Sequence, residues 1–364
     1  MSTPEKYDRY LQSDGPAALV IRQHLVPVEG RDGVLFPSTF AAGDNFRGGY
    51  NVDPPEGERN VCLVDSVGSQ ANRIEPLFKE DKYKGLVPQI TVQAGEKTVN
   101  ILEAGHRAGD AILRCSALQE DFQNAFKALL SGDAEPMGKL APTSLVFGVW
   151  DSRDTQAKVP RVVSSTIRAF NVRKLTRSAV YVPPLDYAEL EVFSDEDKAK
   201  AEGNNKSPLA QRGFVHNPAS GAHGGVIADG GIRRDATLAL AALRLLSVAD
   251  DKDKTLALRR YILGLALVAF TYPPAGYLRQ GCLLVRDDEP KEPHQFVEVS
   301  SDGKREKCKI THDDAVAFAT AAAQAFGIGT DREAAFDPVR AKRDLQGDGK
   351  GKKGKKDKEV AQAK

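Results

Sequence analysis

SLVFGVWDSRDTQAKVPRVVSSTIRAFNVRKLTRSAVY, residues 144–181, is the stretch around which this chain is organised. Residues 145–150 are apolar and predict a buried strand, and the sequence turns polar at residues 151–154. From there to Tyr181 it carries seven cations against two carboxylates, with hydroxyl and amide side chains between them. The cations are Arg153, Lys158, Arg161, Arg168, Arg173, Lys174 and Arg177.

A local excess of five positive charges among neutral hydrogen-bond donors suits a phosphate backbone, which needs both charge neutralisation and donors. Five of the seven cations are arginines, whose planar fork can grip a phosphate with two hydrogen bonds. A solvated surface face is the alternative interpretation. The net charge of +1 hides a segregation: residues 340–364 hold ten Lys and Arg against four Asp and Glu, which leaves 41 against 46 in residues 1–339. Such segregation favours a defined anionic partner.

Composition bounds the class of protein. The chain has 364 residues, of which 41% are hydrophobic and 28% charged, as in soluble globular proteins. Its four cysteines are far apart and form no CxxC pair, so neither a zinc site nor a redox motif is indicated, and we expect no cofactor. The N-terminus is polar, and the most apolar run, residues 261–270, is too short to cross a bilayer. We therefore expect a cytoplasmic protein without a membrane partner.

The order of elements favours an α+β fold, because short strands and helices alternate without a regular βα repeat. Residues 1–339 are expected to form a single domain and the Lys-rich residues 340–364 a disordered tail. Strands are expected at residues 17–28, 60–65, 87–92, 98–102, 281–286 and 295–299. Helices are expected at residues 66–78, 111–118, 120–130, 235–248, 255–270 and 313–326.

Two junctions could bind anions. At the first, the strand of residues 60–65 leads into a helix capped by Ser66, where unpaired backbone N–H groups adjoin Ser69, Gln70, Asn72 and Arg73. An ordinary capped helix is the alternative. At the second, the Gly-rich residues 213–234 end in Arg233 and Arg234 before the expected helix, although their spacing fits neither GxxxxGK[ST] nor GxGxxG. A flexible loop is the alternative there.

Four long segments resemble a known family. They are NVCLVDSVGSQANRIEPLF (60–78), NILEAGHRAGDAILRCS (100–116), LAPTSLVFGVWDSRDTQAKVPRVVSSTIRAFNVRKLTRSAVY (140–181) and ADGGIRRDATLALAALRLL (228–246). Together they are similar to the backbone subunit of the type I-U (also called I-G) CRISPR interference complex, a member of the RAMP superfamily. The resemblance spans about residues 17 to 330 and leaves out the Lys-rich tail.

The resemblance implies a ferredoxin-like, RRM-type palm with large insertions, one of them a thumb-like hairpin. Residues 182–230 and the preceding segment 175–181 are the candidates for that hairpin. It also implies that several copies stack along one CRISPR guide RNA and leave the bases free to pair with target DNA. The implied protein partners are the large subunit, a guide-processing subunit and a recruited helicase-nuclease.

The residues expected to contact RNA combine both lines of reasoning. A subunit that accepts any guide sequence must read phosphates and 2′-hydroxyls and avoid base edges. The predicted RNA-binding residues are Ser69, Gln70, Asn72, Arg73, His106, Arg107, Arg153, Gln156, Lys158, Arg161, Arg168, Arg177, Arg233 and Arg234.

Two enzyme classes are weighed against this non-catalytic role. Related backbone proteins in other CRISPR types cleave RNA with a loop carboxylate, so Asp110, Asp151 or Asp154 could serve a metal-dependent endonuclease. Against that, Asp151 and Asp154 flank Arg153 and more readily orient it than bind Mg²⁺. His106 and Asp110, four residues apart, are expected to share a helical face, but they lack a third ligand for a metal. A phosphate-ester enzyme built on the Gly-rich loop would need nucleotide binding without RNA.

Overall fold

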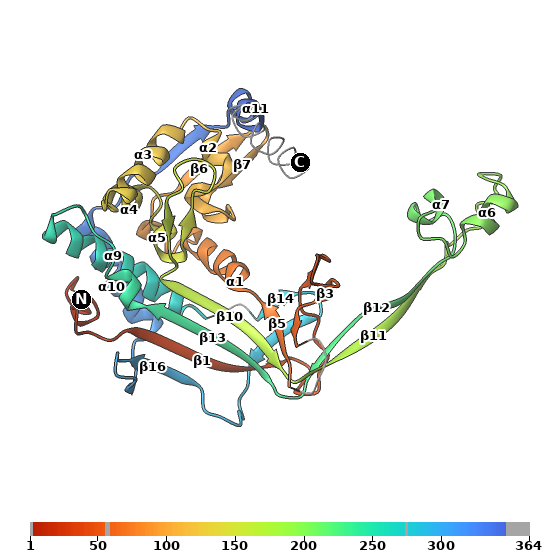
Figure 1. Cartoon of the computed structure of the whole chain (residues 1–364), viewed down its shortest axis with the longest axis horizontal. Coiled ribbons are helices and arrows are strands. Elements are labelled where there is room, and N and C mark those ends of the chain that lie inside the picture. Colours follow the sequence, from red (N-terminus) through yellow and green to blue (C-terminus); the bar gives the residue numbers. More distant parts are fainter. Residues whose placement is uncertain (1–2, 55–58, 274–275, 347–364) are drawn as a thin grey trace, which may run out of the picture.

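A nine-stranded antiparallel sheet forms the base of the molecule in the computed structural model, which describes residues 3–54, 59–273 and 276–346. Its strand order is β14-β15-β1-β13-β10-β5-β4, and β16 pairs with β1 and β17 (Figure 1). The bounds are β1 Ala18–Pro27, β4 Val52–Asp53, β5 Val61–Asp65, β10 Val163–Phe170, β13 Ile232–Ala239, β14 Tyr277–Arg279, β15 Cys282–Arg286, β16 Gln295–Val299 and β17 Arg305–Lys307.

The centre of this sheet is a ferredoxin-like palm. Along the chain come β1, α1 (Val67–Ile74), β10, β13, α9 (Lys252–Thr271) and then β15 and β16. β13 lies between β1 and β10, while β15 and β16 pair with the other edge of β1. α1 and α9 both pack on the same face of the sheet (Figure 1). The α+β class and the ferredoxin-like palm predicted from the sequence are confirmed.

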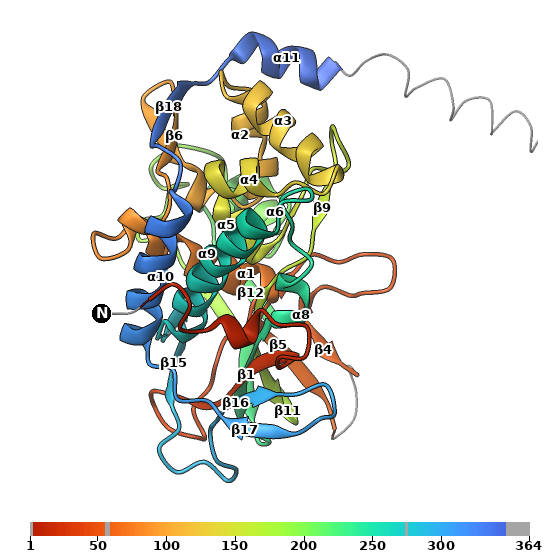
Figure 2. The same ribbon diagram turned by 90° about the vertical axis from the view of Figure 1, so that its left-hand side faces the viewer.

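Local sequence explains the palm helices. Ser66 caps α1 by accepting a hydrogen bond from the backbone N–H of Ser69. α9 is buried along most of its length and packs against α10 (His312–Phe326). α10 begins with a capping box between Thr311 and Asp314 and ends at Gly327, which has φ +66°. These helices cover the palm strands in Figure 2.

An upper lobe sits above the palm and shares its main hydrophobic core, which includes Tyr261, Phe270 and Phe318 from the palm helices and Phe122 and Phe147 from the lobe. It holds a small sheet of order β18-β6-β7. Its bounds are α2 Ala111–Arg114, α3 Gln119–Leu130, α4 Glu135–Leu140, α5 Pro142–Phe147, β6 Ile90–Ala94, β7 Lys97–Asn100, β8 Val149–Trp150, β9 Lys158–Val159, β18 Arg332–Ala335 and α11 Pro338–Gln346. Apart from the arm described below, the other elements are the strands β2 Thr39–Phe40 and β3 Gly49–Tyr50, the helix α8 Leu240–Leu243 and the 3-10 turns Asp8–Tyr10, Glu75–Lys79, Lys84–Leu86, Ile101–Glu103 and Arg107–Gly109.

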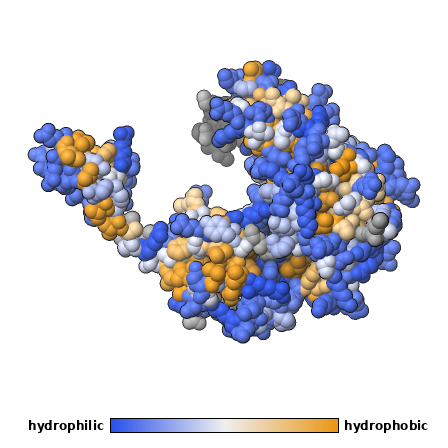
Figure 3. All heavy atoms as spheres, turned by 180° about the vertical axis from the view of Figure 1, so that it is seen from behind, coloured by the Kyte–Doolittle hydropathy of each residue, from blue (hydrophilic) through white to orange (hydrophobic). Residues whose placement is uncertain are grey.

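A two-stranded arm projects from the palm. It consists of β11 (Val172–Tyr181) and β12 (Asn217–Ala228), with α6 (Asp195–Ala201) and α7 (Pro208–Gln211) at its tip. Seen from behind in Figure 3, the arm and the upper lobe enclose a wide hollow. The arm contains most of the predicted thumb region 182–230, but it begins earlier, at Val172, because β10 and β13 continue into it as one long hairpin.

Four sequence expectations about local structure are wrong. Residues 145–147 of the apolar run 145–150 are helical and only Val149–Trp150 form a strand, since Pro142 starts α5 and Gly148 ends it with φ +79°. An apolar run alone does not distinguish a buried helix from a strand. Residues 235–239 belong to β13, and only Leu240–Leu243 are helical, because pairing with both β1 and β10 overrides the helix propensity of this Ala- and Leu-rich segment. The helix expected at 111–118 ends at Arg114.

The fourth concerns the C-terminal tail. Residues 340–346 belong to the helix α11, which is held to the upper lobe by Arg340, whose guanidinium donates to the Ser116 carbonyl, and by an ion pair of Arg114 with Asp344. The other tail residues, 347–364, lie outside the described residues, so the disorder predicted for them stays a prediction. In the described part of the chain, no helix combines the length and the apolar character needed to cross a bilayer.

Candidate nucleic-acid interface

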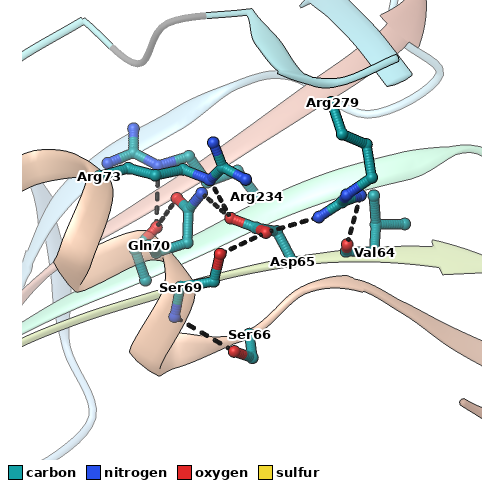
Figure 4. Close-up of polar contacts among 9 residues, drawn as sticks. Val64, Asp65, Ser66, Ser69, Gln70, Arg73, Arg234 and Arg279 are labelled. Carbon is teal, nitrogen blue, oxygen red and sulfur yellow. Dashed lines mark hydrogen bonds and ion pairs between the residues drawn. The ribbon is translucent and has the colours of Figure 1, made fainter. Parts of the chain in front are cut away.

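A buried carboxylate, Asp65, organises the junction between β5 and α1. Its side chain is fully buried and accepts hydrogen bonds from Ser69 Oγ at 2.8 Å and from Gln70 Nε2 at 2.7 Å. It is also ion-paired with Arg73 at 3.3 Å and with Arg279 of β14 at 2.9 Å (Figure 4). Two cations and two neutral donors therefore compensate one buried negative charge, which fixes α1 against the sheet.

This Asp65 network extends across the sheet. Gln70 Oε1 accepts a hydrogen bond from Ser165 Oγ of β10 at 2.9 Å, and Ser165 Oγ in turn accepts one from Arg234 Nε of β13 at 3.0 Å. Figure 4 shows Gln70 and Arg234 of this network beside Asp65. Gln70 and Arg234 are each 3% exposed. Because Gln70 is buried, it cannot contact a nucleic-acid strand bound on the surface. Its side chain instead orients Asp65.

The outer side of α1 combines helix-terminal donors with cations. Ser66 satisfies the N–H of Ser69, whereas the described residues provide no acceptor for the N–H groups of Val67 and Gly68. Arg161 lies across this first turn, and its Nη1 donates to the Val67 carbonyl at 3.3 Å. Arg73 and Asn72 are exposed one turn further along. A helix N-terminus next to a guanidinium is suited to bind a phosphate.

A buried ion pair supports this surface from below. Arg107 Nε lies 2.6 Å from Glu75 Oε2, and both side chains are nearly inaccessible. Arg107 also donates to Asn72 Oδ1 at 3.2 Å, has its guanidinium over the Phe147 ring, and has φ +53°. Burial raises the pKa of Glu75 to about 7, although Arg107 opposes this shift. Arg107 therefore supports Asn72 from below and is too deeply buried to contact a nucleic-acid strand on the surface.

Arg161 belongs to the same group. Burial and the nearby Arg107 guanidinium lower the pKa of Arg161 from its ordinary value, while Glu75 partly offsets them. An arginine stays charged at neutral pH in spite of such a shift. The crowding of like charges instead means that a phosphate at this position would relieve repulsion between Arg161 and Arg107.

The loop between β8 and β9 is folded around Asp151. The Asp151 carboxylate accepts hydrogen bonds from the backbone N–H of Thr155 at 2.8 Å and from its hydroxyl at 2.7 Å. Arg153, Gln156 and Lys158 are all exposed on this loop. Gln156 has φ +63° and donates to the Ser152 carbonyl, and Lys158 Nζ lies 5.5 Å from the centre of the Trp150 ring.

Other predicted residues lie apart from α1. Arg168 and Arg233 point to the face of the palm sheet opposite α1 and α9, which we call the open face; Arg233 lies over the Phe170 ring and is ion-paired with Asp235 at 3.0 Å. Arg177 lies on the arm over the Phe36 ring. His106 is highly exposed, and its Nδ1 is 3.7 Å from Asp110 across a 3-10 turn, so the shared helical face expected for the two is wrong.

Sequence reasoning missed two kinds of residue. Arg279 completes the Asp65 network from a distant strand, and no local pattern could have revealed that pairing. Arg22 and His24 join Arg168 and Arg233 on the open face, where Arg22 pairs with Asp235 at 3.5 Å. Their alternation with Ile21, Gln23 and Leu25 in the first strand was a usable signal that they lie on the opposite face of the sheet.

The three carboxylates considered for catalysis have local partners. Asp151 holds its own loop, Asp154 accepts from Gln123 Nε2 at 2.6 Å, and Asp110 caps α2 by accepting from the Ile112 N–H at 3.1 Å. Over residues 3–54, 59–273 and 276–346, no group of three or more His, Cys, Asp or Glu side chains is placed to hold a metal ion.

These features define a class: a ferredoxin-like palm whose helix-covered side presents a cation-rich surface around α1. Comparison with known proteins agrees with this class. Residues 19–174 match the family described as CRISPR-associated protein GSU0053 (Cas_GSU0053), a segment that runs from β1 into β11 and includes α1 and Arg161. A search of the curated proteins found no match. Over residues 19–174 the chain is thus similar to a CRISPR-associated family, and this similarity supports a role in CRISPR defence.

Proposed function

We propose that this protein is a non-catalytic, guide-binding backbone subunit of a type I-U (I-G) interference complex. In this role, several copies assemble along one CRISPR RNA and hold its sugar–phosphate backbone, so that the bases stay available for target DNA. Its partners would be the large subunit, the guide-processing subunit and a recruited helicase-nuclease.

The observation that carries the proposal is the arrangement at the N-terminus of α1. The unaccepted N–H groups of Val67 and Gly68, the guanidinium of Arg161 and the exposed Arg73 can all donate to phosphate oxygens. Phosphate oxygens carry no sequence information, so contacts to them suit a subunit that must accept every guide sequence.

The rigidity of this surface also supports the proposal. The Asp65 network and the Glu75–Arg107 pair fix α1 from two sides, so the donors are held in place before RNA arrives. Preorganised donors lose less conformational entropy on binding, which increases affinity. The exposed loop cations Arg153 and Lys158 and the arm residue Arg177 would extend contact to neighbouring phosphates.

The test is to purify the protein from cells that also express the partner subunits and a CRISPR array. We expect a high-mass particle that contains RNA of one discrete, guide-derived length. The double variant Arg73→Ala/Arg161→Ala should lose most of that RNA, while Lys252→Ala, at the exposed amino end of α9, should retain it. A nucleic-acid-free monomer from the wild-type chain would contradict the proposal.

The non-catalytic part of the proposal needs its own measurement. Purified particles should be incubated with Mg²⁺ and an RNA complementary to the guide. We expect the target RNA to stay intact in the wild-type protein, and cleavage that Asp151→Ala or Asp154→Ala abolishes would establish the endonuclease alternative.

A further inference from the structure

A second cation-rich site lies at an edge of the palm sheet, next to the carboxyl end of α9 and away from the outer surface of α1. Between the segment of β1 that pairs with β16 and the segment that pairs with β15, the sheet edge opens at residues 23–24. A cavity of about 720 Å³ occupies this opening and reaches the carboxyl end of α9. That volume is within the range of sites that bind small organic ligands, roughly 300–1,000 Å³. The elements around it can be followed in Figure 2.

The lining of the cavity is positively charged. Arg22, Arg234, Arg286 and Lys307 contribute four permanent cations, and the described residues of the lining include no carboxylate. Arg22 has a carboxylate neighbour, Asp235, at 3.5 Å, whereas Arg286 and Lys307 are exposed and have no ion-pair partner in the described part of the chain. The carboxyl end of α9 carries about half a negative charge, which is too little to neutralise this set.

Arg234 is the decisive residue because it is buried and no described residue supplies it with a counter-charge. It is 3% exposed, and it donates hydrogen bonds to two neutral acceptors: Nε to Ser165 Oγ at 3.0 Å and Nη1 to Gln23 Oε1 at 3.5 Å. The described residues supply no acceptor for its Nη2, which belongs to the guanidinium that lines the cavity. Burial lowers the pKa of Arg234 to about 10. A buried guanidinium with no carboxylate is costly unless an anion compensates it.

The neutral part of the lining indicates what kind of anion fits. Phe270, Tyr272 and Phe296 form an aromatic wall, and the amides of Gln23 and Gln295 add hydrogen-bonding groups. His294 also lines the cavity, but both its ring nitrogens are used: Nδ1 accepts from the His24 backbone N–H at 3.1 Å and Nε2 faces the Asp287 carbonyl at 2.8 Å. Aromatic faces beside cations are suited to a base and its phosphate.

We propose that this cavity is a nucleotide site, in which Arg234, Arg286 and Lys307 bind a phosphate and the aromatic wall contacts the base or ribose. The phosphate could belong to a mononucleotide or to the end of an RNA strand, and the two sources share this chemistry. The site is separate from the α1 surface and does not depend on guide loading.

The test uses the full chain, purified without guide RNA. Isothermal titration calorimetry with adenosine 5′-monophosphate and with a 5′-phosphorylated tetraribonucleotide should detect at least one ligand. Preference for the mononucleotide would identify a free nucleotide as the occupant, and preference for the tetranucleotide a strand end. Arg286→Ala/Lys307→Ala should weaken binding by tenfold or more, because two charged contacts are lost.

The matched control is Arg305→Ala, which removes an exposed cation from the same strand as Lys307 but outside the cavity lining. It should bind as the wild type does. Both cavity cations are exposed, so the double variant should fold normally, and its thermal midpoint would verify this. Equal binding by the double variant and the wild type, or no binding of either ligand, would overturn the proposal. Neither result would affect the guide-binding role, which is measured in guide-loaded particles.

Discussion

Replacing Asp65 by Ala tests whether the buried network, more than any surface feature, fixes the palm. The substitution leaves Gln70 Nε2 without its acceptor and removes the counter-charge of Arg279, whose side chain is 24% exposed. Breaking a buried ion pair by removing one partner costs about 3–5 kcal/mol. Arg73 is more exposed and would regain water, so the loss should come mainly from Gln70 and Arg279.

The expected shift in thermal midpoint follows from the size of the chain. With ~2.1 cal/mol/K per residue, 364 residues give an unfolding entropy of roughly 0.76 kcal/mol/K, so a loss of 3–5 kcal/mol lowers the midpoint by about 4–7 °C. Differential scanning calorimetry measures this directly. The control is Asp229→Ala, which removes a carboxylate paired with Arg173 on the solvated arm and should change the midpoint little. A shift for Asp65→Ala no larger than the control would refute the reasoning.

Three further predictions concern the α1 surface and its support. Arg107→Ala should lower the free energy of unfolding by about 3–5 kcal/mol, because Glu75 is left buried and unpaired, and urea denaturation measures this; an unchanged midpoint would contradict it. Burial raises the pKa of Glu75 from 4.5 to about 7, so the folded state keeps a proton that the unfolded chain has released. The free energy of unfolding should therefore fall as pH rises from about 4.5 to about 7, and Glu75→Gln should flatten this part of the curve. If Arg73, Arg153, Lys158, Arg161 and Arg177 each neutralise one phosphate, log affinity for single-stranded RNA should change with log salt with a slope of about −3.5 per subunit, and a slope near zero would argue against those contacts.

The sequence predicted those parts of the fold whose secondary structure is determined by neighbouring residues in the chain. The first strand, the Ser66 cap and the long apolar helix α9 all appear close to the expected residues. The sequence-based prediction failed where contacts with distant residues determine the secondary structure. Residues 235–239 carry helix-forming Ala and Leu but lie between two strands, and the run before Gly148 was too short to distinguish a helix from a strand.

The candidate site was predictable in outline and not in detail. The sequence singled out the junction around Ser66 as a possible anion-binding site, and in the structure Arg73 and Arg161 lie on the outer side of the helix that begins there. Which side chains face outward depends on partners that are remote in the chain. Gln70 points inward because its Oε1 accepts a hydrogen bond from Ser165, and Arg107 is buried because it packs against Glu75 and Phe147.

The most direct test of the central claim is to map the guide on the protein. Particles purified with their RNA should be irradiated with ultraviolet light, and the cross-linked peptides identified by mass spectrometry. The account predicts cross-links within residues 66–73 and 153–161, on the outer side of α1 and the adjoining loop. Cross-links confined to the open face, around Arg22 and Arg233, would contradict it and would place the guide on the opposite side of the palm.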